Sequence, residues 1–258
     1  MSQKRVKTII LGDEIGLPTL KIVSEKANLD YRAVVWSNKI HNPKNELFYN
    51  VHQIQFTKNE PSALIRFIHE EEIELLLVYS FDVIIPRDVL DIPGLKSVNF
   101  HGGELPKYRG ANILNWVLIE GQTSMAITMH EIEEGVDSGP VIYESKLPIL
   151  KNDTAITLRD KIDNEIRQSF PEALIGYLSG IVTPVKQKTG DISYYKRRNE
   201  DDGLFDWSWD DEDIYNLIRA LVFPWPGARF LNKKGNLEII QTFMTLEQIF
   251  AIRNRETE

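Results

Sequence analysis

Short, continuous apolar runs alternate with segments of helical spacing over the first two-thirds of the chain. The continuous runs predict buried strands, and apolar residues spaced three or four positions apart predict helices. The predicted strands are residues 6–11, 31–36, 75–79, 97–100 and 125–130. The predicted helices are residues 18–27, 61–72, 87–90, 111–120 and 155–178, the last capped by Asp153-Thr154 and containing Pro171, where proline disfavours a continuous helix.

Apolar strands separated by helices are typical of a parallel sheet that helices cover on both faces. We therefore predict an α/β fold, a Rossmann-like and mostly parallel sheet, and we expect the strands of the first domain to be parallel throughout. Such sheets bind ligands beyond the carboxyl ends of their strands, so Gly12, residues 79–82 and His101 should line one crevice.

The pattern changes after Thr183. A strand or hairpin arm is predicted over residues 190–198, a turn over 200–203, an amphipathic helix over 211–222 and a late strand over 237–243. The residues after Thr183 are too few for an independent core. They should therefore pack on the first domain or on a second subunit. The predicted domains are residues 1–182, which carry catalysis, and residues 183–258, a small α+β segment that contacts substrate or forms a dimer interface.

Polar side chains of complementary chemistry follow one of the predicted strands. Asn99 and His101 are two residues apart and should face the same side of an extended strand, and Asp137 lies in a glycine-bounded turn, residues 135–139. An amide, an imidazole and a carboxylate can stabilise an oxyanion, move a proton and orient the group that moves it. The plain alternatives are a core histidine bonded to a backbone carbonyl and an aspartate in ordinary turn chemistry.

Composition narrows the classes of function. The chain has 258 residues, 42% of them apolar, which is enough for one large core or for one core with a small appendage. The formal net charge of −8 argues against broad nucleic-acid binding but allows a local basic pocket for a phosphate. Cysteine is absent from the sequence, which excludes disulfides and thiolate-bound metals. The first apolar run is broken early by Gly12 and Asp13, so it predicts neither a signal peptide nor a membrane span, and we expect a cytoplasmic protein.

The order of these motifs is similar to that of a known family. Asn99-x-His101 is followed by Leu-Pro-Lys-Tyr-Arg-Gly at residues 105–110 and then by Asp137 near a glycine. This joint pattern resembles the formyltransferases that use 10-formyltetrahydrofolate and act on methionyl-tRNA, on glycinamide ribonucleotide or on nucleotide-linked amino sugars. The resemblance extends from about Val6 to about Arg229.

The chain departs from the family pattern in one place. Gly102-Gly103 stand where the family commonly has Pro-Ser, and Glu104 replaces a residue that is usually apolar. The departure leaves Asn99, His101 and Asp137 intact but affects the shape of the neighbouring loop and of the substrate pocket beside it.

The resemblance implies catalytic roles for Asn99, His101 and Asp137, 10-formyltetrahydrofolate as the formyl donor, and no metal. The family's apolar pterin pocket corresponds to residues 79–86, whose side chains could equally be plain core. The implied folate contacts are Phe81, Ile85, Glu131, Glu133 and Gly135.

Candidate contacts to the acceptor substrate lie outside this pocket. They are Gly12, Arg109, Tyr194, Lys196 and Arg198. The loop at residues 12–16 lacks the G-x-G-x-x-G spacing and carries two acids, so a plain turn is preferred there to a dinucleotide loop, although the family places this loop near the amine substrate. Basic residues beside Tyr194-Tyr195 suit a nucleotide's base and diphosphate, and a solvated charged arm is the alternative.

We therefore expect an enzyme that formylates the amine of a nucleotide-linked amino-deoxy sugar, a reaction whose products feed bacterial surface polysaccharides. Methionyl-tRNA formyltransferase is disfavoured by the acidic balance and the short C-terminal segment. Formyltetrahydrofolate hydrolase usually carries an additional N-terminal domain, and a non-catalytic folate- or nucleotide-binding module would not need the three polar residues. The resemblance, together with Trp207, Trp209 and Trp225, which we expect to be exposed, predicts a homodimer.

Overall fold

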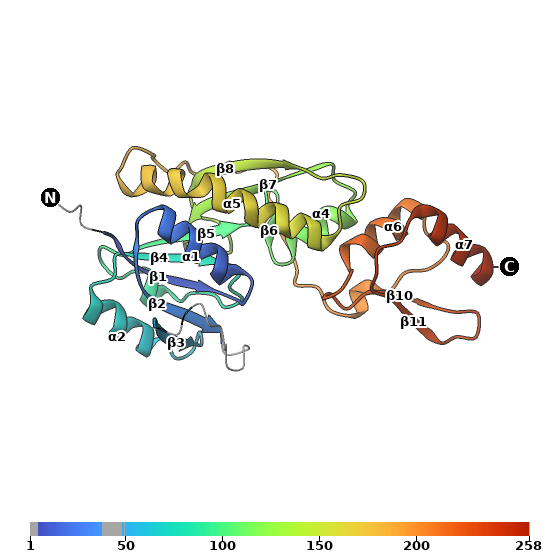
Figure 1. Cartoon of the computed structure of the whole chain (residues 1–258), viewed down its shortest axis with the longest axis horizontal. Helices are drawn as coiled ribbons and strands as arrows, with labels where there is room; N and C mark the ends of the chain where they lie inside the picture. Colours follow the sequence, from blue (N-terminus) through green and yellow to red (C-terminus); the bar gives the residue numbers. More distant parts are fainter. Residues whose placement is uncertain (1–4, 38–47, 49, 258) are drawn as a thin grey trace. The chain divides into compact units, whose positions relative to one another are not determined.

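A seven-stranded sheet organises the larger part of the chain in a computed structural model that describes residues 5–37, 48 and 50–257 (Figure 1). The strand order is β3-β2-β1-β4-β5-β7-β8. The strands are β1 (Lys7–Gly12), β2 (Asp30–Ser37), β3 (His52–Phe56), β4 (Leu75–Tyr79), β5 (Lys96–His101), β7 (Ser124–Glu131) and β8 (Val141–Pro148). The mostly parallel α/β fold predicted from the sequence is confirmed.

The direction of one strand differs from our expectation. The pairs β1–β2, β2–β3, β1–β4 and β4–β5 are parallel, but β7 runs antiparallel to β5. The expectation of a wholly parallel sheet was therefore wrong, because the apolar run at Met125–Met129 reports burial on both faces and carries no signal of strand direction. The strands β3 and β8 were not predicted, since both lie at edges of the sheet and mix exposed polar residues with buried ones.

The chain divides into two units that interleave along the sequence. The first unit comprises the described residues of 5–101, 127–145 and 163–191, and the second comprises residues 102–126, 146–162 and 192–257. The sequence analysis predicted two consecutive domains that meet between residues 182 and 183, and that division stays a prediction.

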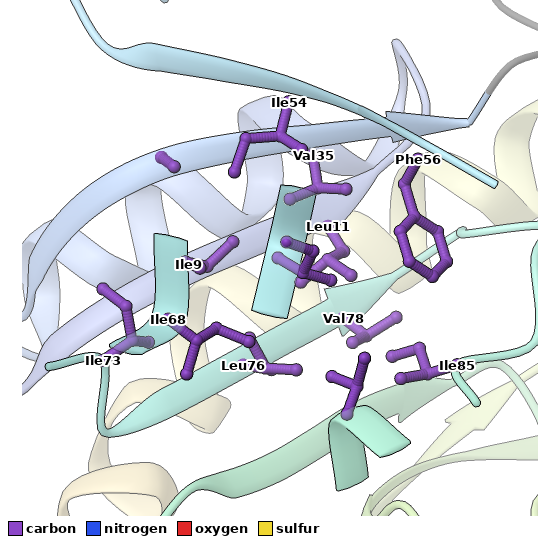
Figure 2. Packing of buried hydrophobic residues seen from close by; sticks show 13 residues of the cluster. Ile9, Leu11, Val35, Ile54, Phe56, Ile68, Ile73, Leu76, Val78 and Ile85 are labelled. Atoms are coloured by element: carbon purple, nitrogen blue, oxygen red, sulfur yellow. The ribbon is translucent and has the colours of Figure 1, made fainter. Parts of the chain in front are cut away.

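One face of the sheet carries the main apolar core of the first unit. In parallel strands, residues in register share a face, so Ile9 and Leu76, and Leu11 and Val78, point the same way. Figure 2 shows these side chains packed with Phe56 and with neighbours from the adjoining helices. Those helices are α2 (Ser62–Glu71), which contributes Leu64 and Ile68, and α3 (Arg87–Leu90), which contributes Val89.

The opposite face is covered by α1 (Gly16–Lys26) and α5 (Ala155–Leu178). Arg167 of α5 donates two hydrogen bonds to the Thr19 hydroxyl of α1, and the Phe170 ring packs edge-on against Phe100 of β5 with centroids 4.9 Å apart. Both faces of the sheet are thus covered by helices, as predicted. The helix α5 continues through Pro171, and its predicted bounds are confirmed.

The strand order reverses between β1 and β4, where α/β sheets open a crevice. The Asp13 carboxylate accepts hydrogen bonds from the backbone N–H groups of Ile15 and Gly16 at 3.0 and 2.7 Å, and from the Ser80 hydroxyl at 2.7 Å. A Cβ on Gly16 would lie 2.4 Å from the Tyr79 carbonyl oxygen, so only glycine allows this approach. Asp13 therefore ties the end of β1 to the end of β4.

The second unit is built from short elements around a small core. They are β6 (Arg109–Gly110), α4 (Ile113–Ile119), β9 (Tyr194–Tyr195), the 3₁₀ helix η2 (Asp201–Gly203), α6 (Asp211–Ala220), β10 (Ala228–Leu231), β11 (Leu237–Ile240) and α7 (Leu246–Thr257). The predicted arm at residues 190–198 is reduced to β9, which pairs with β6 in parallel, and α7 was not predicted. Trp207 is half-buried against Phe205 and Phe230, with centroids 5.0 and 4.9 Å away, whereas Trp209 is 43% exposed.

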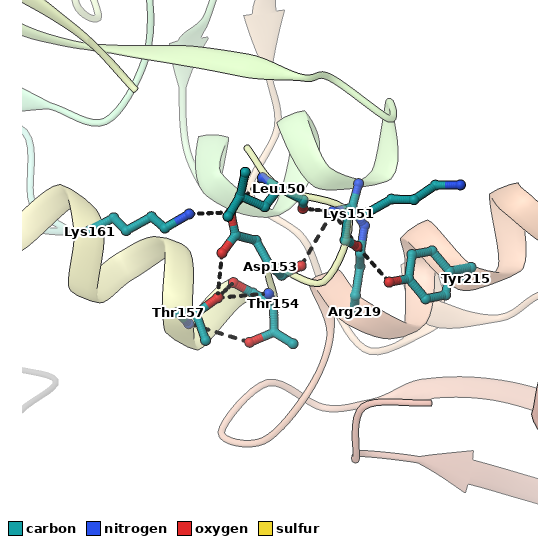
Figure 3. Close-up of polar contacts among 8 residues, drawn as sticks. All are labelled: Leu150, Lys151, Asp153, Thr154, Thr157, Lys161, Tyr215 and Arg219. Carbon is teal, nitrogen blue, oxygen red and sulfur yellow. Dashed lines mark hydrogen bonds and ion pairs between the residues drawn. The ribbon is translucent and has the colours of Figure 1, made fainter. Parts of the chain in front are cut away.

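A polar network around Asp153 holds the start of α5 in the second unit (Figure 3). The carboxylate accepts hydrogen bonds from Lys161 at 2.5 Å, from the Leu150 N–H at 2.7 Å and from the Thr157 hydroxyl at 3.1 Å. Burial alone would raise the pKa of Asp153, but these hydrogen bonds together lower that pKa below its ordinary value. The predicted cap at Asp153-Thr154 is confirmed, since Thr154 also accepts the Thr157 N–H.

Among the described helices, none is long and apolar enough to cross a bilayer.

We expect Asp153→Asn to lower the free energy of unfolding by about 1–3 kcal/mol near neutral pH, because the ionised carboxylate holds its donors better than an amide does. A carboxyl group with a lowered folded-state pKa stabilises the fold above its unfolded pKa of about 3.9 and loses that contribution as pH falls further. Urea unfolding, measured from neutral pH to below this pKa, should show that the variant's loss of unfolding free energy shrinks in acid. The control is Asp160→Asn, which alters an exposed carboxylate on the same helix. A deficit that does not change with pH would contradict this role for Asp153.

Candidate active site

The site is built where β5 and β7 pair side by side in the first unit. Asn99 is in register with Val78 of β4, so its side chain lies on the face of the sheet that carries the main core. His101 is two residues further along the same strand and shares that face. The antiparallel neighbour β7 sets His130 directly opposite Asn99.

Asp137 approaches His101 from the loop after β7. Its Oδ1 lies 3.6 Å from His101 Nδ1, and both side chains are largely buried, with 13% and 7% of their surfaces exposed. This separation is an ion-pair distance and is longer than a hydrogen bond, a common state for catalytic groups before substrate binds. The predicted proximity of Asp137 to the imidazole is confirmed, while the catalytic roles of these residues stay predictions.

His130 is a member of this group that the sequence did not predict. Its Nε2 lies 3.1 Å from Asn99 Nδ2 and 3.6 Å from the same Asp137 oxygen that faces His101. Its Nδ1 lies 2.7 Å from the Glu131 carbonyl oxygen, which can only accept a hydrogen bond, so neutral His130 carries its proton on Nδ1 and accepts from Asn99 through Nε2. One Asp137 oxygen thus lies 3.6 Å from a nitrogen of each imidazole, and the centroids of the two rings are 6.2 Å apart.

The loop that carries Asp137 is held in an unusual backbone conformation. Asp137 has φ +48°, in the left-handed region that costs a non-glycine residue about 1–2 kcal/mol. A Cβ on Gly139 would lie 1.9 Å from the Glu131 carbonyl oxygen, so the loop can fold back on the end of β7 only because this residue is glycine. The Glu131 N–H donates to the Pro140 carbonyl oxygen at 2.9 Å and closes the loop.

The predicted folate contacts occupy different environments. Ile85 is 7% exposed inside the core cluster, and Phe81 packs against the same cluster, while Ile84 beside them is 54% exposed. Glu131 accepts a hydrogen bond from the Tyr177 hydroxyl at 2.6 Å, and Glu133 and Gly135 are exposed in the loop before Asp137. Burial, followed by the Glu131 contact, raises the pKa of Tyr177. Whether these residues contact folate stays a prediction.

The predicted acceptor contacts belong to the second unit, apart from Gly12, which ends β1 opposite Tyr79 of β4. Arg109 is buried, with 7% exposure, and its Nη1 donates to the Tyr194 hydroxyl at 2.8 Å. Tyr194 itself is 61% exposed. A cation and an accessible phenol thus lie together where β6 pairs with β9.

A second cationic group lies on an indole of the same unit. The Arg198 guanidinium stacks 4.5 Å above the Trp116 ring, and burial lowers its pKa, an effect that Asp202 partly opposes. Lys196 pairs with Asp202 at 2.6 Å, and its carbonyl oxygen accepts the Trp116 indole N–H at 3.1 Å. These contacts tie the basic arm to the folded unit. A freely solvated arm would not make them.

An aromatic pair packs beside these residues in the second unit. The rings of Tyr108 and Tyr195 stack with centroids 5.1 Å apart, and both hydroxyls donate to Glu120, at 2.8 and 2.7 Å. Burial and the Glu120 carboxylate raise the pKa of Tyr195 to about 12.

Across the described residues, the acidic and histidine side chains form no cluster suited to a metal ion.

Comparison with known proteins places the chain in a family. A family described as Formyl transferase matches residues 20–174, more than half of the chain, and its C-terminal domain matches residues 198–248. The chain belongs to the formyl transferase family. In this family member, the β5–β7 group lies inside the first matched region and the Arg198 arm begins the second.

Three relatives give the range of similarity. A methionyl-tRNA formyltransferase of Thermodesulfovibrio yellowstonii is 35% identical over 169 residues, which cover 66% of this chain and only 54% of the relative. A sugar N-formyltransferase from a Shewanella species has a TM-score of 0.76 at 15% identity, covering 94% and 99% of the two chains. An N-formyltransferase from Helicobacter canadensis, in a complex with folinic acid and dTDP-3-aminofucose, has a TM-score of 0.64 at 21% identity, covering 85% and 81%. The two solved structures show a shared fold.

We expect ¹⁵N NMR of the protein to show neutral His130 with its proton on Nδ1, because the Glu131 carbonyl oxygen requires a donor there. Asn99→Leu removes the donor to Nε2 and should shift the Nε2 resonance while leaving the Nδ1 proton in place. His69, an exposed imidazole on α2, should be unaffected. A proton on Nε2 of neutral His130 would show that the contact with Asn99 runs in the opposite direction.

Proposed function

We propose that this protein transfers the formyl group of 10-formyltetrahydrofolate to the amine of a nucleotide-linked amino sugar. The observation that carries formyl transfer is the grouping of Asn99, His101 and Asp137 at the end of β5 in a chain of the formyl transferase family. The choice of acceptor rests on a second and independent observation in the second unit.

The proposed chemistry gives each of the three side chains a role. The acceptor nitrogen attacks the formyl carbon, a C–N bond forms, and the carbonyl oxygen becomes an oxyanion. Asn99 donates its amide to that oxyanion, an interaction of roughly 3 kcal/mol in comparable sites. His101 takes a proton from the attacking nitrogen, and Asp137 orients the imidazole and stabilises its charge. The bond from the formyl carbon to N10 of the folate then breaks, and N10 takes the proton that His101 received.

His130 supports Asn99 in this proposal. An amide nitrogen carries two hydrogens, and His130 Nε2 accepts one of them at 3.1 Å. The orientation of the amide is then fixed before substrate binds, and the second hydrogen serves the oxyanion. Preorganised donors of this kind lower a barrier because they need no reorientation during the reaction.

The proposed donor site uses the loops around the carboxyl ends of β4 and β7. Phe81, the neighbouring exposed Ile84 and the loop of residues 131–135 offer apolar surface and backbone groups for a pterin. The buried side chain of Ile85 supports this proposed surface from beneath. The folinic acid in the complex of the Helicobacter canadensis relative supports a folate as donor.

The proposed acceptor class rests on cations held beside aromatic rings. Arg198 over Trp116 and Arg109 beside Tyr194 combine positive charge with flat apolar surface, which suits a nucleotide's diphosphate and base. These groups lie in a chain whose formal net charge is −8, so the positive charge is local. The dTDP-3-aminofucose in the same Helicobacter canadensis complex supports this acceptor class.

Methionyl-tRNA is the second candidate acceptor. It is favoured by the 35% identity to a methionyl-tRNA formyltransferase, although the chain spans about half the length of that relative. A tRNA acceptor would need several phosphates to be neutralised at once, and binding would then fall steeply with salt.

We also propose a homodimer. The hairpin of β10 and β11 exposes Leu231, Leu237 and Ile239 by 57%, 50% and 51%, an apolar surface suited to association. Sedimentation of the purified protein gives its oligomeric state directly.

The acceptor is tested by incubating the protein and 10-formyltetrahydrofolate with two sets of amines, nucleotide-linked amino sugars and charged initiator tRNA. We expect mass spectrometry to find a gain of one formyl group on an amino sugar, formed at least about a hundredfold more slowly with His101→Ala. Formylation of tRNA alone, with salt-sensitive binding, would select the second candidate. Formylation of neither acceptor would contradict the proposal.

We expect Arg198→Ala to raise the KM for the sugar-nucleotide acceptor roughly tenfold, because a stacked cation facing a diphosphate is lost. The KM for the folate should change little. Arg198→Lys keeps the charge but loses the planar stack, so it should give an intermediate value. Lys234→Ala removes an exposed cation elsewhere in the same unit and serves as the matched control. Equal effects of Arg198→Ala on both KM values would argue against a specific acceptor role.

A further inference from the structure

We infer that Gln187 is a positioning residue for Asp137, and this inference rests on the proposed function. Gln187 lies beyond α5, far along the chain from the loop of residues 135–139. Its side-chain Nε2 donates to the carbonyl oxygens of Asp137 and Gly139, at 2.8 and 2.7 Å. Both amide hydrogens are therefore used on the loop that carries the carboxylate beside His101.

The two accepting carbonyls bracket a single residue, Ser138, so one side chain fixes the backbone on both sides of it. Asp137 is in the left-handed conformation, with φ +48°, which an aspartate does not favour without support from its surroundings. The direction in which a side chain leaves the backbone follows from the backbone conformation. Holding the Asp137 carbonyl therefore also holds the carboxylate 3.6 Å from His101 Nδ1.

The position of Gln187 is itself fixed by the backbone next to it. Val185 and Val141 exchange two backbone hydrogen bonds, each of 2.8 Å, as an isolated antiparallel bridge. This bridge joins the segment before Gln187 to the first residue of β8, immediately after the loop. Loss of the Gln187 amide alone would leave this bridge in place, so the effect of a side-chain variant can be separated from undocking of the segment.

Gln187 has no place in the proposed chemistry of bond making and breaking. Its role runs through Asp137, and it should alter the rate of the chemical step more than the binding of either substrate. A purely structural glutamine would instead affect folding and leave the imidazole environment unchanged.

The first test uses the 258-residue chain without substrates and ¹⁵N NMR of its histidines, with the His101 signal assigned by its loss in His101→Gln. Gln187→Met keeps the length of the side chain and removes both donors. We expect it to move the His101 Nδ1 resonance in the same direction as Asp137→Asn does. Gln187→Glu, a second variant of matched length that cannot donate when ionised, should do the same. Lys188→Ala, on the same exposed segment, is the control and should move nothing.

The second test is kinetic and uses the acceptor that is formylated in the incubation described above. Gln187→Met should lower kcat about tenfold or more and leave both KM values within about twofold, because misplacing a catalytic group affects the transition state more than ground-state binding. In an Asp137→Asn background, Gln187→Met should cause no further loss.

The outcomes separate this inference from the proposed function. If Asp137→Asn moves the His101 resonance and Gln187→Met does not, the role of Gln187 is overturned and the proposed function stands. If Asp137→Asn itself leaves the resonance unmoved, the contact between Asp137 and His101 fails, and the inference fails with it. Independent losses from Gln187→Met and Asp137→Asn would also overturn positioning through Asp137.

Discussion

The antiparallel pairing of β5 with β7 is the constraint on which the candidate site depends. It sets His130 opposite Asn99 and places the end of β7 beside Val98, so the loop after β7 begins next to Ser97 and folds back to bring Asp137 to His101. The register of this strand pair and the folded-back loop together bring an amide, two imidazoles and a carboxylate close together.

The two units supply different kinds of chemistry. The first unit holds the buried imidazoles of His101 and His130, with Asp137 Oδ1 3.6 Å from a nitrogen of each ring. The second unit holds arginines against aromatic rings, fixed by hydrogen bonds from Arg109 to the Tyr194 hydroxyl and from Arg198 to the Asp202 backbone carbonyl. Formyl transfer needs preorganised polar groups, whereas recognition of a charged nucleotide needs delocalised cations and flat surfaces, so this division agrees with the proposed function.

Much of the fold could be predicted from the sequence because buried parallel strands leave continuous apolar runs, and β4, α3 and α5 were predicted residue for residue. The edge strands β3 and β8 were missed because one exposed edge weakens that signal. The grouping of Asn99, His101 and Asp137 was found through a family motif and a two-residue spacing. His130 was missed because only the register between two strands brings it to Asn99, and a lone histidine at the end of an apolar strand carries no sign of that register. Gln187 was missed for a similar reason, since its two contacts are 50 and 48 residues away in sequence.

The central claim is that His101 and Asp137 act as one unit in formyl transfer. The most direct measurement is a double-mutant cycle of His101→Ala and Asp137→Asn, in which the rate of formyl transfer is determined in a single turnover with saturating donor and acceptor. We expect each variant to be slow and the double variant to be no slower than His101→Ala alone, because a carboxylate that works through an imidazole has nothing to act on once the imidazole is gone. Losses that multiply in the double variant would contradict the claim and show that the two residues contribute separately.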